Sequence, residues 1–158
     1  MRILGIDPGL AVTGFGILEI DGDEVVCGEA GAFETTPGAL AARLKTIFMN
    51  VTDIINRQTP QEVAIEEGFY GKNIKVAMSL GQARGAALLA CGMRDLPIIE
   101  YSPREVKLAV VGRGAASKEQ VQYMIKVILK LAESPKRHDV SDALAVAYCH
   151  YQRRVKKF

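Results

Sequence analysis

The chain has 158 residues, of which 49% are hydrophobic and 24% are charged. This length and composition exclude a disordered or fibrous protein and predict one globular domain with an ordinary buried core. No apolar run reaches the ~18 residues that a membrane helix needs, so we expect no membrane partner. The formal net charge is only +2, which by itself is a weak indication of a nucleic-acid partner.

The N-terminus and the cysteines indicate where the protein acts. The first apolar run is broken by Gly5 and closed by Asp7, unlike a signal peptide. Cys27, Cys91 and Cys149 lie far apart without a C-x-x-C pair, which favours reduced thiols over disulfides or a zinc site. We therefore expect a cytoplasmic protein.

Basic residues gather in the later half of the chain, whereas acids are frequent from Glu19 to Glu34. The basic residues are Lys72, Lys75, Arg84, Arg104, Lys107, Arg113, Lys118, Lys136 and Arg137, with four more between 153 and 157. This distribution allows a basic face, and an ordinary solvated surface is an equally good interpretation. We treat residues from about 152 to 158 as a short basic tail.

The first elements in chain order are strands. Residues 2–7 form a short apolar run that ends in an Asp-Pro-Gly turn. Two β-like runs follow at 13–20 and 24–33, and Asp-Gly-Asp at 21–23 joins them as a hairpin. The opening therefore predicts an antiparallel meander.

Helices dominate the remainder. Apolar residues recur at helical period from Leu40 to Ile55, which predicts a helix that ends near Thr59-Pro60. A short strand over 62–66 and a helix over 75–93 follow, although three glycines weaken the helix prediction.

The last elements begin with clear capping signals. A strand over 97–100 precedes a helix that begins at Ser102-Pro103. A capping box at 117–120 begins the next helix, and a final helix is expected over 139–151. The order indicates a mixed sheet covered by helices, in one domain of residues 1–158.

Acidic residues end two predicted strands and open the last predicted helix. Asp7 follows the first strand, Glu66 and Glu67 follow the fourth, and Asp139 and Asp142 share one helix face. If the strands are neighbours, four carboxylates converge at the rim of the sheet. A cation relieves their repulsion, and oxygen ligands favour Mg²⁺ or Mn²⁺. Two ions ~3.5–4 Å apart assist phosphodiester hydrolysis, so the pattern predicts a nuclease site.

Each acid also has a simpler interpretation. Asp139 can cap the helix, with Asp142 favoured by the helix dipole. Asp7 can serve the turn, and Glu66 and Glu67 can be solvated at a strand end. Spacing alone leaves these alternatives open, together with the choice between Glu66 and Glu67.

The two histidines are weaker candidates. His138 could bind metal or move a proton, and a surface position beside a helix cap is the simpler interpretation. His150, near the end of the last predicted helix, is expected at the surface. The sequence has no G-x-S-x-G element and no G-x-x-x-x-G-K-[ST] loop, which argues against acyl transfer and P-loop ATP hydrolysis.

Four segments stand in a recognisable order. They are Gly-Ile-Asp-Pro-Gly at 5–9 with Thr13-Gly14, Ala-Ile-Glu at 64–66, Leu-Gly-Gln-Ala-Arg-Gly at 80–85 and Asp-Val-Ser-Asp-Ala-Leu-Ala at 139–145. The first also occurs in sugar kinases and actin-like ATPases. The ordered set resembles the RuvC family of Holliday junction endonucleases, from residue 3 to about 150.

The resemblance implies an α/β protein with an RNase H-like fold, in which helices flank a mixed five-stranded sheet. It implies a homodimer that makes paired symmetric nicks in four-way DNA junctions during recombination and repair. The active site would hold two Mg²⁺ ions, replaceable by Mn²⁺, and branch-migration proteins of the RuvA and RuvB type are possible partners. The catalytic and metal-binding acids carry over as Asp7, Glu66, Asp139 and Asp142.

Six residues are expected to bind DNA, some of them through the resemblance. These are Phe69, Tyr70, Lys72, Arg84, Lys107 and Lys118. Phe69 matches an aromatic side chain that enters the junction centre, and stacking on bases gives it a physical role. Lys107 and Lys118 match positions near the scissile phosphate. The alternatives are a loop aromatic packed on the fold and ordinary surface lysines.

One departure and two rival functions remain. Glu67 places an extra acid beside Glu66, which could alter metal occupancy. A junction-binding module without catalysis is disfavoured because all four acids are present. An actin-like phosphotransferase is disfavoured because it usually needs a far longer chain.

Overall fold

The structure, a computed structural model, describes residues 1–68 and 73–155. Its elements are β1 (Arg2–Asp7), β2 (Val12–Asp21), β3 (Glu24–Glu34), α1 (Leu40–Gln58), β4 (Glu62–Glu66), α2 (Ile74–Gly92), β5 (Ile98–Tyr101), α3 (Pro103–Val111), α4 (Lys118–Ile128) and α5 (His138–Val155). Each element expected from the sequence is present, with bounds that differ by a few residues at most.

The strands form one mixed sheet in the order β3-β2-β1-β4-β5. The pairs β1–β2 and β2–β3 are antiparallel, whereas β4 is parallel to both β1 and β5. The central strand β1 is buried over Ile3 to Ile6, which explains its unbroken apolar sequence. The meander and the five-stranded mixed sheet of the RNase H-like fold are confirmed.

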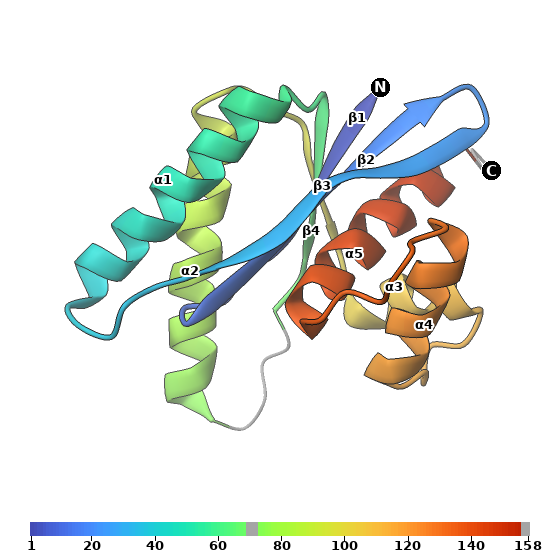
Figure 1. Cartoon of the computed structure of the whole chain (residues 1–158). Helices are drawn as coiled ribbons and strands as arrows, with labels where there is room; N and C mark the ends of the chain where they lie inside the picture. The colour runs from blue at the N-terminus through green and yellow to red at the C-terminus, as the bar shows by residue number, and fades with distance from the viewer. Residues whose placement is uncertain (69–72, 156–158) are drawn as a thin grey trace.

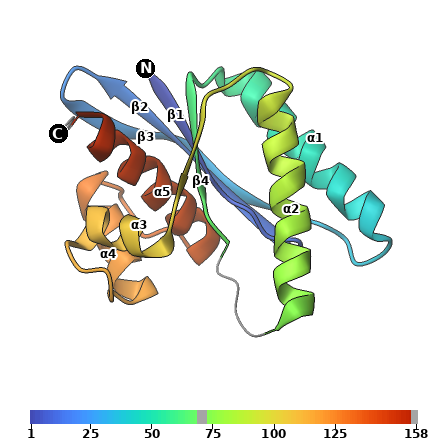
Figure 2. The same cartoon turned by 180° about the vertical axis from the view of Figure 1, so that it is seen from behind.

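Helices cover both faces of the sheet. Helices α1 and α2 lie on one face, and α3, α4 and α5 lie on the other (Figures 1 and 2). Leu4 and Ile6 of β1 pack in the core beneath α1 and α2, whereas Ile3 packs in the core beneath α5. This alternation follows from the period of two along a strand.

Helix α5 lies very close to the centre of the sheet. A Cβ atom added at Gly5 would lie 2.0 Å from the Ala143 carbonyl oxygen, and one added at Gly16 would lie 2.5 Å from Leu144 Cδ2. Gly5 and Gly16 are register partners on β1 and β2. Only glycine fits at these two positions, because the helix occupies the space that a side chain would need.

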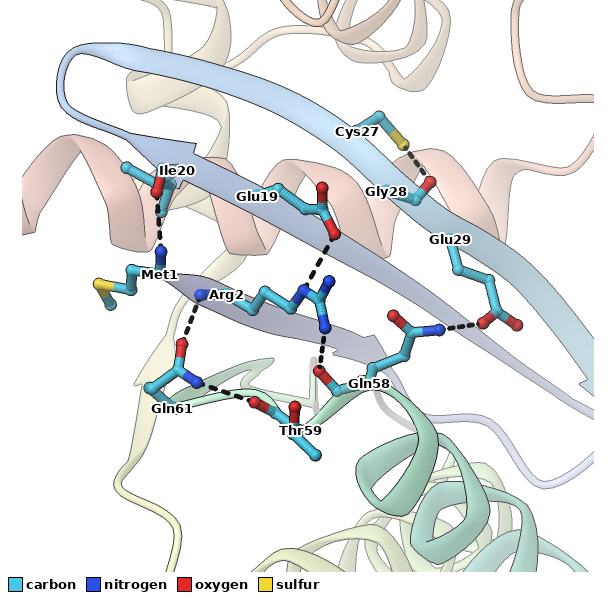
Figure 3. Close-up of polar contacts among 10 residues, drawn as sticks. All are labelled: Met1, Arg2, Glu19, Ile20, Cys27, Gly28, Glu29, Gln58, Thr59 and Gln61. Atoms are coloured by element: carbon cyan, nitrogen blue, oxygen red, sulfur yellow. Dashed lines mark hydrogen bonds and ion pairs between the residues drawn. The ribbon is translucent and has the colours of Figure 1, made fainter.

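Polar contacts fix the end of the sheet where β1 begins (Figure 3). The Arg2 guanidinium donates to Glu19 Oε1 at 2.9 Å and to the Gln58 carbonyl oxygen at 3.0 Å. The Arg2 backbone N–H donates to Gln61 Oε1, and the Gln58 amide donates to Glu29. These contacts connect the end of α1 to β1, β2 and β3. The candidate acids lie at the opposite end of β1 and β4.

Helix caps follow the sequence closely, but the last helix is longer than expected. Ser102 and Ser117 both form capping boxes. Helix α5 continues to Val155 instead of ending at residue 151. Its last turn is tied to the fold because Arg153 pairs with Glu105 and Arg154 pairs with Glu62.

The expectation that His150 lies at the surface is wrong. His150 is only 7% exposed. Its Nδ1 lies 2.8 Å from the Tyr101 hydroxyl, and its Nε2 lies 2.7 Å from Glu62 Oε2. These partners belong to β5 and β4, on which this face of α5 packs. None of the helices in residues 1–68 and 73–155 combines the length and the apolar character needed to span a membrane.

Candidate active site

Asp7 and Glu66 lie at the same edge of the sheet. They end the parallel neighbours β1 and β4, whose register pairs Ile6 with Ile65. Gly5 and Ala64, two residues earlier, both face α5. Because side chains alternate along a strand, Asp7 and Glu66 also face α5.

The beginning of α5 brings two more acids to this edge. Asp139 lies in the first turn of the helix, after His138, so its interpretation as the N-cap residue is wrong. The Asp139 backbone packs on Gly14, the register partner of Asp7. Asp142 follows one turn later, on the same helix face. The four acids predicted from the sequence therefore come together from three separate elements.

Burial and mutual repulsion shift the protonation of the two strand-end acids. Burial, followed by the charges of Asp142, Glu66 and Asp139, raises the pKa of Asp7 from 3.8 to about 8. Burial and then the charge of Asp142 raise the pKa of Glu66 from 4.5 to about 7. Such raised values are typical of carboxylates gathered at a functional site.

Two basic side chains lie against the acids. Lys118 Nζ donates to Asp142 Oδ2 at 3.0 Å, and this bond raises the pKa of Lys118. Arg137 donates to Glu34 Oε1 at 2.6 Å, while its Nε lies 3.8 Å from Asp139 Oδ2. Sequence reasoning did not identify the pair of Arg137 and Glu34, because the two residues lie 103 positions apart along the chain.

The donor set fits a hard divalent cation. All four donors are carboxylates, the oxygen ligands that such ions prefer. Among residues 1–68 and 73–155, no three acidic, histidine or cysteine side chains converge closely enough to hold an ion as they stand. Asp142 Oδ2 lies 3.0 Å from Lys118 Nζ, and Asp139 Oδ2 lies 3.8 Å from Arg137 Nε. A cation would compete with these two basic groups for the same oxygens.

A cleft of about 320 Å³ opens beside the acids. It is lined by Glu66, Asp142, Lys107 and Lys118, with an apolar wall of Pro103, Val106 and Val121 from α3 and α4. Both lysines predicted to contact phosphate therefore lie at the acidic centre. Their positive charges lower the pKa of Glu66, although less than burial and Asp142 raise it.

The other predicted residues lie elsewhere. Arg84 is on α2, where its guanidinium pairs with Glu100 and its side chain is 17% exposed. Glu67 is exposed just after β4, and His138 is exposed at the start of α5. Glu67 is not among the main groups that shift the pKa of Asp7 or Glu66, whereas Glu66 is one of the charges that raise the pKa of Asp7. Phe69, Tyr70 and Lys72 lie outside the described residues.

Comparison with known proteins agrees with this geometry. A family model described as crossover junction endodeoxyribonuclease RuvC matches residues 3–150. The RuvC of Pelotomaculum thermopropionicum is 46% identical over 162 aligned positions that cover 99% of each chain.

Solved structures give the same result. The Thermus thermophilus RuvC structure has a TM-score of 0.90 at 32% identity and covers 99% of this chain and 97% of its own. The T. thermophilus RuvC in complex with Holliday junction substrate also has a TM-score of 0.90, at 34% identity, covering 98% and 96%. The chain therefore belongs to the RuvC family of crossover junction endodeoxyribonucleases.

Proposed function

We propose that this enzyme resolves four-way DNA junctions at a centre made of Asp7, Glu66, Asp139 and Asp142. The observation that carries the proposal is the convergence of these carboxylates beside Lys107 and Lys118, with the pKa of Asp7 raised to about 8. Acids that repel one another in a partly buried site, next to cations suited to phosphate, indicate metal-assisted phosphodiester hydrolysis.

Members of the family are metal-dependent nucleases. We infer that the ion here is Mg²⁺, with Mn²⁺ as a substitute, and that each site holds two ions. The four carboxylates supply enough negative charge for two divalent cations. When bound, such ions activate a water molecule and stabilise the leaving oxygen.

The chain's own residues bind and orient the substrate phosphate. Hydrolysis joins a water oxygen to phosphorus and breaks one phosphate ester bond, and the departing sugar oxygen takes up a proton. Lys107 and Lys118, which line the cleft with Glu66, neutralise the phosphate as it enters. Phosphate binding also draws Lys118 from Asp142, whose carboxylate then becomes available as a ligand.

Junction DNA is the proposed substrate because the T. thermophilus relative was solved in complex with Holliday junction substrate. Phe69, with Tyr70 beside it, follows Glu66 closely in the chain, so its ring can stack at the crossover. Lys72 and Arg84 are further proposed contacts, and Arg84 would have to exchange Glu100 for a phosphate. Proteins of the RuvA and RuvB type are proposed partners. The three free thiols suit the reducing cytoplasm in which we expect the enzyme to act.

The outer face of α2 supports a homodimer. Met78 and Leu89 are 60% and 58% exposed, and a Cβ added at Gly81, Gly85 or Gly92 would meet no atom within 4 Å. These five positions share one helix face. An apolar face with glycines allows the same helix of a second copy to approach closely, and a two-fold dimer presents two identical sites to the two cut strands.

Dimerisation is tested by sedimentation of Leu89→Glu. We expect monomers and the loss of paired nicks, because a buried glutamate without a partner opposes association. The matched control is Val127→Glu, which places the same charge at a 51% exposed position on α4. A dimeric Leu89→Glu variant would place the interface elsewhere.

The catalytic proposal is tested on a denaturing gel. Purified protein is incubated with a labelled four-way junction or a matched linear duplex, with Mg²⁺ or with chelator. We expect paired symmetric nicks in the junction alone and only with Mg²⁺. Glu66→Gln, Asp139→Asn and Asp142→Asn should each lose cleavage while keeping junction affinity. Binding without any cleavage by the wild-type protein would instead indicate a junction-binding module.

A further inference from the structure

A close contact between α5 and β2 lies at an acid of the proposed active site. A Cβ atom added at Gly14 would lie 2.1 Å from the Asp139 carbonyl oxygen, 2.4 Å from the Asp139 carbonyl carbon and 3.0 Å from Asp139 Cβ. Ordinary carbon-to-oxygen contacts are about 3.3–3.6 Å. The first turn of α5 therefore rests directly on the backbone of β2.

Gly14 also connects two acids. It is the register partner of Asp7 across the β1–β2 pair, so the strand that carries Asp7 and the helix that carries Asp139 meet at this glycine. The depth of this contact decides how far Asp139 stands from Asp7. A side chain at position 14 would increase that separation by roughly 1 Å or more, given ordinary contact distances.

Arg137 and Glu34 make a second contact near Asp139. Arg137 donates to Glu34 Oε1 at 2.6 Å, and its Nε lies 3.8 Å from Asp139 Oδ2. Glu34 ends β3 and pairs with Val12 at the start of β2. The start of α5 is thus fixed to the β2–β3 pair by a close backbone contact and by an ion pair.

We propose that Gly14 is a positioning residue, assisted by Arg137 and Glu34, which sets the separation of Asp139 from Asp7. This inference rests on the proposed function of these two acids. It adds a role for a residue that has no side chain to offer to a substrate or a metal ion. The glycine is needed for the distance between two carboxylates and not for the stability of its strand.

The first test compares Gly14→Ala with Gly28→Ala. The control adds the same methyl group to β3, where its contacts are at 3.2 Å or more and belong to the side chains of Glu19 and Ile17. We expect Gly14→Ala to cleave junctions about 10²-fold more slowly, since a displacement of about 1 Å in an active site has this effect. Mn²⁺ affinity, measured by calorimetry without DNA, should fall in Gly14→Ala and stay unchanged in Gly28→Ala.

The second test is rescue by a longer acid. Asp139→Glu adds one methylene to the side chain, so it should lower activity in the wild-type background and raise it at least tenfold in the Gly14→Ala background. A residue that merely stabilises the strand would not produce this reversal. Equal activity of Gly14→Ala and the double variant, or normal cleavage and Mn²⁺ affinity in Gly14→Ala, overturns the inference.

Two further variants keep the test decisive. If Gly14→Ala does not fold, Glu34→Gln takes its place. This exposed change removes the charge that holds the Arg137 guanidinium, so Arg137 competes more strongly for the Asp139 carboxylate. Mn²⁺ binding should weaken severalfold at an unchanged melting temperature, and unchanged Mn²⁺ binding overturns the inference. Asp139→Asn distinguishes a failure of the proposed active site from a failure of the role of Gly14. Cleavage by Asp139→Asn at the wild-type rate refutes the proposed site, whereas an inactive Asp139→Asn beside a normal Gly14→Ala refutes only the role of Gly14.

Discussion

Replacing Asp7 by asparagine should stabilise the folded protein while it abolishes cleavage. The pKa of Asp7 is raised from 3.8 in its ordinary state to about 8 by burial and by the charges of Asp142, Glu66 and Asp139. Folding therefore opposes ionisation of this carboxyl. The destabilisation is absent below pH 4 and grows as the pH rises toward 8, because the unfolded chain releases the proton first.

The size of the effect follows from the same shift. At pH 7, just over three pH units above the ordinary pKa of Asp7, the free energy of unfolding is lowered by at most about 4 kcal/mol, at roughly 1.4 kcal/mol per unit. Asparagine avoids the charge but still buries a polar amide, and the cost of burying it offsets part of the gain in the free energy of unfolding. We expect a net stabilisation of about 1–2 kcal/mol, or about 2–8 °C in melting temperature for a chain of this size.

The assay is thermal melting in chelator from pH 4 to pH 8, beside junction cleavage in Mg²⁺. The gain in Asp7→Asn should shrink as the pH falls, and Mg²⁺ should raise the melting temperature of the wild type more than that of the variant. Asp21→Asn makes the same change at an exposed position of the hairpin and should shift stability by less than about 0.5 kcal/mol. An Asp7→Asn variant that melts below the wild type at pH 7 would refute the reasoning.

Three further predictions concern DNA contacts and the core. Lys107→Ala should weaken binding to all junctions alike. The slope of the logarithm of the binding constant against the logarithm of the salt concentration, measured by fluorescence anisotropy, should fall in magnitude by about one unit. An unchanged slope would make Lys107 an ordinary surface residue. Phe69→Ala should slow single-turnover cleavage without lowering the melting temperature, whereas Phe69→Tyr should keep most activity; a loss of stability in proportion to activity would place the ring in the core. Leu144→Ala should lower the free energy of unfolding by about 2–5 kcal/mol in urea titration, because Leu144 is fully buried against Gly16, and a loss below about 1 kcal/mol would contradict this packing.

The sequence by itself determined the elements and most of their ends. The spacing of apolar residues predicted α1 and the strands. Ser102 and Ser117 marked the starts of α3 and α4, because a capping box depends only on residues three positions apart. The four candidate acids were also identified from motifs. Their convergence was an expectation that depended on β1 and β4 being neighbours, which the sheet order confirms.

Tertiary structure alone decided the contacts between distant segments. The pairing of Arg137 with Glu34, the burial of His150 and the bond from Lys118 to Asp142 all join parts of the chain that local patterns treat independently. The close approach of Asp139 to Gly14 is of the same kind, since it depends on how deeply α5 packs on the sheet. Periodicity and capping are short-range properties of the chain, whereas packing depth is set by all the side chains between two layers at once.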